Sequence, residues 1–129
     1  MGFLSRFSPQ IYALLRIVTG LMFAMHGAGK LFGWPTGPAM TGVPLMLVAG
    51  LIEFVAGLMI GLGFGTRIAA FIASGEMAAA YFMVHAKGGL FPIVNKGELA
   101  VVYCFLFLYF ASVGSGTFSL KSVVMKKKG

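Results

Sequence analysis

Four segments of the sequence are each apolar over roughly 20 residues, and this feature restricts the fold more than any other. About 20 apolar residues in a helix cross the hydrocarbon core of a bilayer, which is about 30 Å thick. Backbone groups in lipid must be satisfied within the segment, so each crossing is predicted to be helical. The predicted spans are residues 11–32, 44–64, 67–86 and 97–118. The sequence therefore predicts an all-α protein, an integral membrane four-helix bundle formed by residues 1–129 as one domain.

Composition and charge exclude several other classes of protein. Hydrophobic residues make up 59% of the chain and charged residues 10%, whereas a soluble domain carries about 25% charged residues. No basic face of a soluble fold is visible, so nucleic-acid binding is not expected. The net charge of +7 is concentrated partly in Lys126–Lys128, and a basic tail beside a span typically binds the anionic leaflet surface. The single cysteine, Cys104, allows no internal disulfide and no Cys-x-x-Cys motif.

The distribution of cations between the connections predicts the orientation. Short connections make neighbouring spans antiparallel, and cytoplasmic connections carry the excess of lysine and arginine. With the N-terminus inside, six cations lie on the cytoplasmic side and three outside. The six are Arg6, Arg67, Lys121, Lys126, Lys127 and Lys128, and the three are Lys30, Lys87 and Lys96. We therefore predict a multi-pass protein of the cell (inner) membrane with both termini in the cytoplasm.

Three charged residues are predicted to lie away from the ends of the spans, where charges are costly. Glu53 and Glu76 fall in the second and third spans and Arg16 in the first. A charge at the bilayer centre costs roughly 2.5–3.5 kcal/mol on insertion scales, so these side chains are expected to face the bundle interior and one another. The planar guanidinium of Arg16 makes it the favoured partner for one of the glutamates. Glu53 also shares a helix face with Gly57 and Gly61, small residues that allow close helix approach.

Further polar residues gather in the outer third of the predicted bundle. They are His26, Lys30, His85, Lys87, Asn95, Lys96 and Glu98. The pattern predicts a polar pocket that opens outward, with Glu53 and Glu76 at its floor. On an ideal helix His85 faces away from Glu76, so it joins this cluster only where the helix ends or distorts. Haem b held by His26 and His85 is disfavoured because their depths differ, and no metal site is predicted. A plainer interpretation is that the intramembrane glutamates and arginine only fix helix register and that the histidines are interfacial.

Several motifs along the chain together resemble a known family. Arg16 and Gly20 precede His26-Gly27-x-x-Lys30, and Glu53 begins a glycine-rich run to Gly63. Asn95-x-Gly97-Glu98 opens the fourth span, and Gly114-x-Gly116-x-x-Ser119-Leu120 closes it. This ordered set covers nearly the whole chain and resembles the DoxX-like family of small four-span membrane proteins. Lys121 is a departure, because an acidic residue often follows the Ser-Leu pair in that family.

The resemblance implies a quinone-linked redox role as a membrane subunit. Some relatives are subunits of archaeal terminal quinol oxidase or of thiosulfate:quinone oxidoreductase, and others belong to membrane complexes for redox and thiol stress. On this hypothesis His26 and Glu98 exchange protons with the quinone, and Lys30, Asn95 and Tyr103 are its hydrogen-bonding candidates. Arg16 and Glu53 orient the site and tune its electrostatics. The physical argument alone adds Glu76 and His85 to the polar cluster.

Two other classes of function stay open at this point. No motif for an electron carrier is recognisable, so a quinone site needs redox protein subunits as partners, and whether the chain is itself an enzyme is undecided. The chain could instead be a non-catalytic scaffold or assembly subunit. It could also form a homo-oligomer. It could also be a small proton- or ion-coupled transporter, although the lack of an obvious inverted repeat counts against transport.

Overall fold

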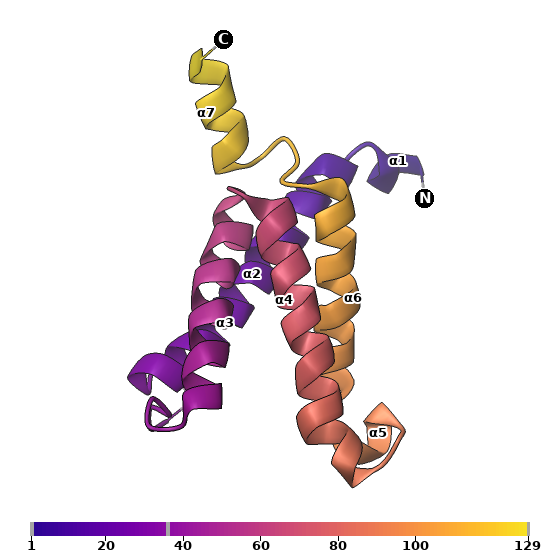
Figure 1. The fold of residues 1–129 in the computed structure, drawn as a ribbon. Helices are drawn as coiled ribbons and strands as arrows, with labels where there is room; N and C mark the ends of the chain where they lie inside the picture. The colour runs from indigo at the N-terminus through magenta and orange to yellow at the C-terminus, as the bar shows by residue number, and fades with distance from the viewer. Residues whose placement is uncertain (1, 36, 129) are drawn as a thin grey trace.

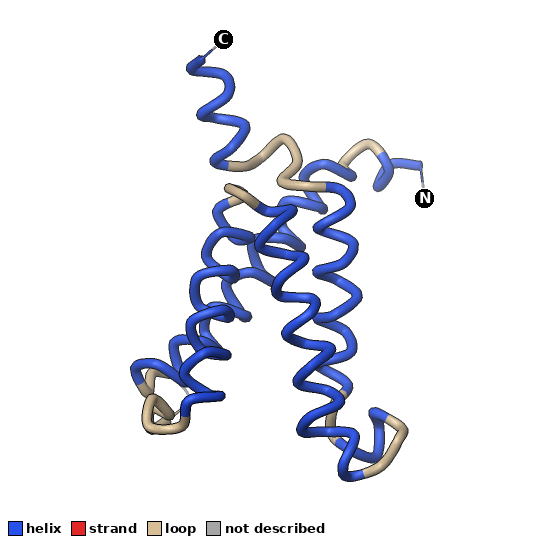
Figure 2. Tube along the Cα trace, viewed as in Figure 1, coloured by secondary structure: helices blue, strands red, loops and turns tan. Residues whose placement is uncertain are grey.

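The computed structural model is helical, and it describes the backbone of residues 2–35 and 37–128 and the side chains of 2–35 and 37–124. Its four long helices are α2 (Ser8–Phe32), α3 (Pro44–Leu62), α4 (Thr66–Ala80) and α6 (Glu98–Val113). They run up and down with short connections (Figures 1 and 2). The shorter elements are α1 (Gly2–Ser5), the π turn η1 (Tyr81–His85), the 3₁₀ turn η2 (Ala86–Gly88), α5 (Pro92–Asn95) and α7 (Leu120–Lys128). No strand is present in the described ranges.

The helix boundaries follow from proline and glycine. Pro9 and Pro44 lie in the first turns of α2 and α3, where a missing backbone N–H leaves no gap in the hydrogen-bond ladder. Both helices end at a glycine in the left-handed conformation, Gly33 with φ 79° and Gly63 with φ 78°. A residue with a Cβ is strained in that conformation, so glycine is the usual stop signal.

Three helical segments have the length and composition to cross a membrane: Ser8–Phe32, Pro44–Leu62 and Thr66–Gly88. The fourth, α6, is apolar but has only 16 residues, which corresponds to about 24 Å at 1.5 Å per residue. The sequence predicts helix as far as Phe118, whereas α6 ends at Val113. Gly114 and Gly116 both have positive φ, so the helical ladder cannot continue through this segment.

Glycines bring α2 and α3 into close contact along the face that carries Glu53. A Cβ at Gly20 would lie 2.5 Å from the backbone nitrogen of Gly61, and a Cβ at Gly57 would lie 2.5 Å from that of Ala24. Real Cβ atoms do not approach so closely, so the backbones touch only because both positions are glycine. The predicted small-residue packing of the Glu53 face therefore agrees with the structure, in the manner common for membrane helices.

Aromatic residues form the core that joins α6 to α2 and α4. Phe107 and Phe110 of α6 are fully buried, and they pack with Phe23 of α2 and with alanines of α4. Figure 1 shows the pair α2–α3 and the pair α4–α6 meeting near the end with the two termini and diverging toward the end with α5. Helix α7 projects beyond the bundle (Figure 1). The side chains of Lys126, Lys127 and Lys128, for which leaflet binding is predicted, lie outside the described residues.

Arg16 does not pair with a glutamate, so this prediction is wrong. Its guanidinium donates to the carbonyl of Ser115 and, at 2.7 Å, to that of Phe118. Glu53 contacts Lys30 instead, and Lys30 lies 14 residues along α2 from Arg16, about 21 Å along a helix axis. The backbone carbonyls after Val113 have no hydrogen-bond partners within a helix. They accept the Arg16 N–H groups that were predicted to bind a glutamate carboxylate.

A second arginine supports the same end of the bundle. Arg67 donates to the carbonyls of Ser112 at 2.6 Å and of Ala111 and Val113 at 3.1 Å each. These are the last carbonyls of α6, where the helix dipole attracts a cation. The hydroxyl of Tyr12 adds a hydrogen bond to the carbonyl of Gly114 at 2.6 Å. Arg67 of α4 thus holds the end of α6, and side chains of α2 hold the irregular segment that follows.

Candidate functional site

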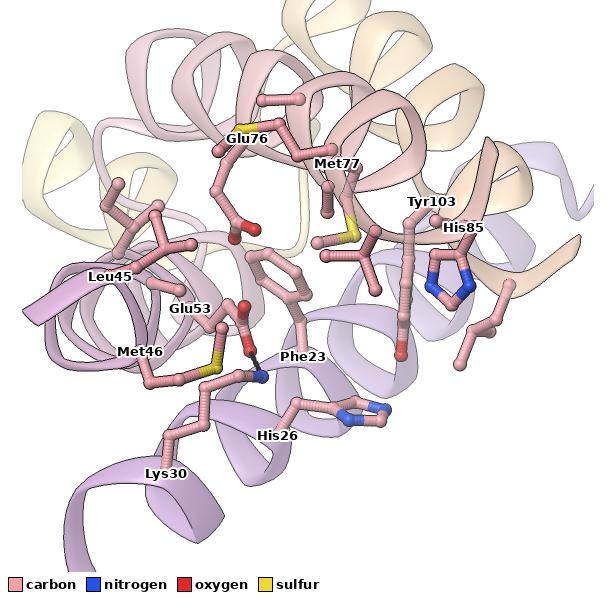
Figure 3. Close-up of a pocket in the computed structure, with 18 of the residues that line it drawn as sticks. Phe23, His26, Lys30, Leu45, Met46, Glu53, Glu76, Met77, His85 and Tyr103 are labelled. Carbon is pink, nitrogen blue, oxygen red and sulfur yellow. Dashed lines mark hydrogen bonds and ion pairs between the residues drawn. The ribbon is translucent and has the colours of Figure 1, made fainter. Parts of the chain in front are cut away.

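A cavity of about 460 Å³ lies between the two diverging helix pairs. Its volume falls in the range of small-molecule sites in proteins, about 300–1,000 Å³. Leucine, methionine, valine and alanine side chains of α3, α4, η1 and α6 form most of its wall. The polar lining residues are His26, Lys30, Glu53, Glu76, His85, Lys96 and Tyr103. The sequence predicts a polar chamber, whereas the structure has an apolar pocket with a few polar groups at defined places (Figure 3).

An ion pair between α2 and α3 forms one wall of the pocket. Lys30 Nζ lies 2.7 Å from Glu53 Oε1. The Glu53 side chain is only 3% exposed, whereas that of Lys30 is 24% exposed. The flexible lysine stem lets its ammonium reach inward from the end of α2 while its other face stays accessible. Glu53 is therefore neutralised where it is buried.

Two further polar groups in the pocket wall have no partner within the described part of the chain. They are Glu76 Oε1 and the hydroxyl of Tyr103, both of which are buried atoms. Figure 3 shows the carboxyl of Glu76 directed toward that of Glu53, and the Tyr103 hydroxyl directed toward the side that holds His26. A buried polar atom without a partner costs about 1–3 kcal/mol. Such atoms facing one cavity are typical of a site completed by a ligand or by water.

The π turn η1 explains how His85 reaches the pocket. Glu76 and His85 would lie on opposite faces of a regular helix, but Tyr81–His85 forms a π turn with one extra residue. The insertion rotates the following side chain, and π turns of this kind often occur at functional sites. The half-buried His85 thereby joins the lining, with its Nδ1 lying 3.3 Å from the carbonyl oxygen of Asn95. His26 is exposed at the rim, and its ring centroid is 6.1 Å from that of Tyr103.

Comparison with known proteins places the chain in a family. The family model DoxX matches residues 11–86, which include most of α2, all of α3 and Glu76. The chain belongs to the DoxX family. It is 46% identical to an uncharacterized protein of Haemophilus influenzae, over 98% of this chain and 100% of the relative. It is 27% identical to "Putative oxidoreductase CatD" of Bacillus subtilis, over 89% of this chain and 87% of the relative. No solved structure matches the chain.

Besides Arg16, two predicted site residues of this DoxX protein do not line the pocket. Asn95 is buried, and its amide nitrogen donates to the carbonyl of Gly89 at 2.8 Å and to the Tyr81 hydroxyl at 3.1 Å. Its Oδ1 accepts the backbone N–H of Gly97 at 2.8 Å. These bonds hold the connection before α6 in place and leave its amide no free donor for a ligand. Glu98 is exposed in the first turn of α6, where a carboxylate interacts favourably with the helix dipole.

The sequence gives little sign of the apolar wall that completes the site. Phe23 is 1% exposed and packs at 5.3 Å, centroid to centroid, against Tyr103, which is 3% exposed. Met77 of α4 lines the pocket beside them (Figure 3). Phe23 shares the helix stripe of Arg16 and Lys30, and this was the one available signal for its inward direction. Many phenylalanines and methionines on the chain face outward, so residue type alone could not select these two.

Proposed function

We propose that this DoxX family member binds a quinone in the pocket and acts as the membrane subunit of a quinone-linked oxidoreductase. The observation that carries the proposal is the buried Tyr103 hydroxyl, which faces an apolar cavity without a hydrogen-bond partner in the described chain. A flat apolar ring with polar oxygens at its edges suits such a pocket. The relative named "Putative oxidoreductase CatD" supports a redox role.

The residues of the pocket fit the two ends of such a ligand. Tyr103 offers a hydroxyl that can donate to a ring oxygen, and the Glu53–Glu76 side offers carboxyl groups at the other wall. Phe23 and Met77 would provide apolar contact for the ring. A bound quinone would supply two-electron, two-proton redox chemistry. A partner redox subunit would exchange the electrons with it.

Substitution of Tyr103 by phenylalanine tests the site. Loss of one hydrogen bond is expected to weaken binding of decylubiquinone about 3- to 10-fold, since such a bond contributes about 0.5–1.5 kcal/mol. The ligand-free protein should lose no thermal stability, because the hydroxyl has no partner to lose. Binding is measured by titration of detergent-purified protein, and native quinone is sought by mass spectrometry of the extracted lipids.

The matched control is Tyr109→Phe, because Tyr109 is exposed on the same helix and does not line the pocket. It should bind decylubiquinone like the unchanged protein. Absence of native quinone together with no measurable binding would overturn the proposed function. If both variants bound decylubiquinone equally weakly, the Tyr103 hydroxyl would not be a contact of the ligand.

We also propose that the chain crosses the cell (inner) membrane several times with both termini in the cytoplasm. The two ends of the chain lie at the same end of the bundle (Figure 1), as an even number of crossings requires. In a Cys104→Ala background, a cysteine at exposed Lys87 should react with an impermeant maleimide on intact cells. A cysteine at exposed Arg6 should not react until the cells are opened. The reverse pattern would invert the orientation.

A further inference from the structure

Two carboxyl groups face one another in the pocket with one cation in contact. Lys30 Nζ is bound to Glu53 Oε1 at 2.7 Å. The carboxyl of Glu76 is directed toward that of Glu53 (Figure 3), and its buried Oε1 has no partner among the described residues. One ammonium balances one carboxylate charge. The second carboxyl therefore has no ionic partner of its own.

The other titratable groups around the pocket do not fill this role. They are His26 on α2, His85 on η1, Lys96 before α6, and Tyr103 on α6. Lys96 is exposed at the rim, where its charge is solvated rather than directed at a carboxylate. His85 is within reach of the Asn95 carbonyl, and His26 packs its ring against Tyr103. The hydrogen-bond network assigns neither histidine to Glu76.

Two ionised carboxylates beside one another in an apolar cavity repel and lose hydration, so such a pair retains a proton. We propose that Glu53 and Glu76 hold one proton between them, and that Glu76 presents it as a hydrogen-bond donor to a carbonyl oxygen of the ligand. The ligand contact rests on the proposed function, whereas the held proton does not. The inference narrows the ligand class, because an acid donor binds the strong carbonyl acceptor of the oxidised ring better than the weaker hydroxyl oxygen of the reduced ring.

Each of four side chains has a separate role in this arrangement. Lys30 keeps Glu53 as the ionised member of the pair, and Glu53 keeps the proton on Glu76. Glu76 then supplies the donor at one end of the ligand while Tyr103 supplies the donor at the other. A hydroxyl oxygen of the reduced ring can also accept a hydrogen bond, but it is a weaker acceptor than a ring carbonyl, so the oxidised form should bind more tightly.

Infrared difference spectroscopy of the purified, ligand-free protein tests the held proton. A protonated carboxylic acid has a carbonyl stretch above the amide band, and this band shifts when the protein is moved into heavy water. We expect the band near neutral pH in the unchanged protein and its complete loss in Glu76→Gln. It should persist in Glu98→Gln, because Glu98 is exposed on α6 and lies outside the pocket. A spectrum without an acid band would overturn the proposal.

Glu53→Gln tests whether the proton on Glu76 depends on Glu53, as a proton shared by the pair must. Removing the Glu53 charge frees Lys30 to balance Glu76, so the acid band should diminish or vanish in this variant as well. A band of unchanged intensity in Glu53→Gln would contradict sharing. The heavy-water shift is measured on the unchanged protein, so the held proton is tested even where a variant folds poorly.

Addition of oxidised decylubiquinone tests the ligand contact separately. The acid band should shift in frequency when the ligand binds, and the reduced form should bind several-fold more weakly. Glu76→Gln keeps a donor group and should retain most of the binding, whereas Glu76→Leu should lose it. Binding without any change in the band would contradict the contact while leaving the proposed function intact. If the protein shows the acid band but binds no quinone, the proposed function is overturned. The proposal that the carboxyl pair holds a proton would then still stand.

Discussion

Replacing Lys30 by methionine is expected to lower the free energy of unfolding by about 3 kcal/mol. The substitution keeps the apolar stem but removes the ammonium that lies 2.7 Å from Glu53 Oε1. Breaking a buried ion pair by deleting one partner costs about 3–5 kcal/mol. The lower end applies here because Lys30 is partly exposed and because an abandoned carboxyl can take up a proton. Unfolding by SDS in mixed micelles, followed by circular dichroism, measures the change.

The double variant Lys30→Met/Glu53→Met separates the charge effect from packing. It removes both members of the pair, so most of the stability lost in the single variant should return, as happens when a buried pair is replaced by apolar residues. Lys87→Met is the matched control, since Lys87 is exposed in η2 and its loss should change stability by less than about 0.5 kcal/mol. Equal losses in the single and double variants would show that the ion pair does not hold α2 to α3.

The sequence predicts the long apolar helices because membrane thickness sets the length of a potential span. Residues 11–32 and 44–64 agree with α2 and α3 to within three residues at each end, since proline and glycine mark their ends. The packed face of Glu53 was also predictable, because Gly57 follows it by one helical turn. These features depend on local chemistry and on the helical period. The DoxX resemblance is confirmed by the match over residues 11–86.

The pairing of charges could not be predicted because it depends on depth and on connections. Arg16 and Lys30 share one stripe of α2, so helical angle alone does not say which of them meets Glu53. The connection after α2 folds back, with the Met40 N–H donating to the Lys30 carbonyl at 2.7 Å, and no sequence pattern fixes that geometry. The early end of α6 at Val113 was missed because the predicted span was extended to Phe118, across the glycines and polar residues that follow Val113.

Replacing Arg16 by leucine is expected to have an effect as large as that of the Lys30 change, at the opposite end of the bundle. Arg16 is 1% exposed, and its guanidinium binds the carbonyls of Ser115 and Phe118. The Ser115 carbonyl would be left unpaired in a buried place, which costs about 1–3 kcal/mol, and the part-buried Phe118 carbonyl would lose its partner as well. The total loss should therefore be about 3 kcal/mol, measured by the same unfolding titration in detergent.

A local readout shows whether this loss comes from the segment between α6 and α7. Without Arg16 the segment from Gly114 to Phe118 loses its buried anchor, so trypsin should cleave faster after Lys121, whose N–H donates to the Gly63 carbonyl at 3.1 Å. Arg67→Leu is the matched control. Arg67 is exposed and its carbonyl partners can bond to water instead, so its loss should cost only about 0.3–1 kcal/mol. Arg16→Lys should fall between the two, because an ammonium keeps the charge but lacks the planar fork that reaches both carbonyls. If Arg16→Leu and Arg67→Leu had equal stability and equal rates of cleavage after Lys121, Arg16 would not be the anchor of this segment.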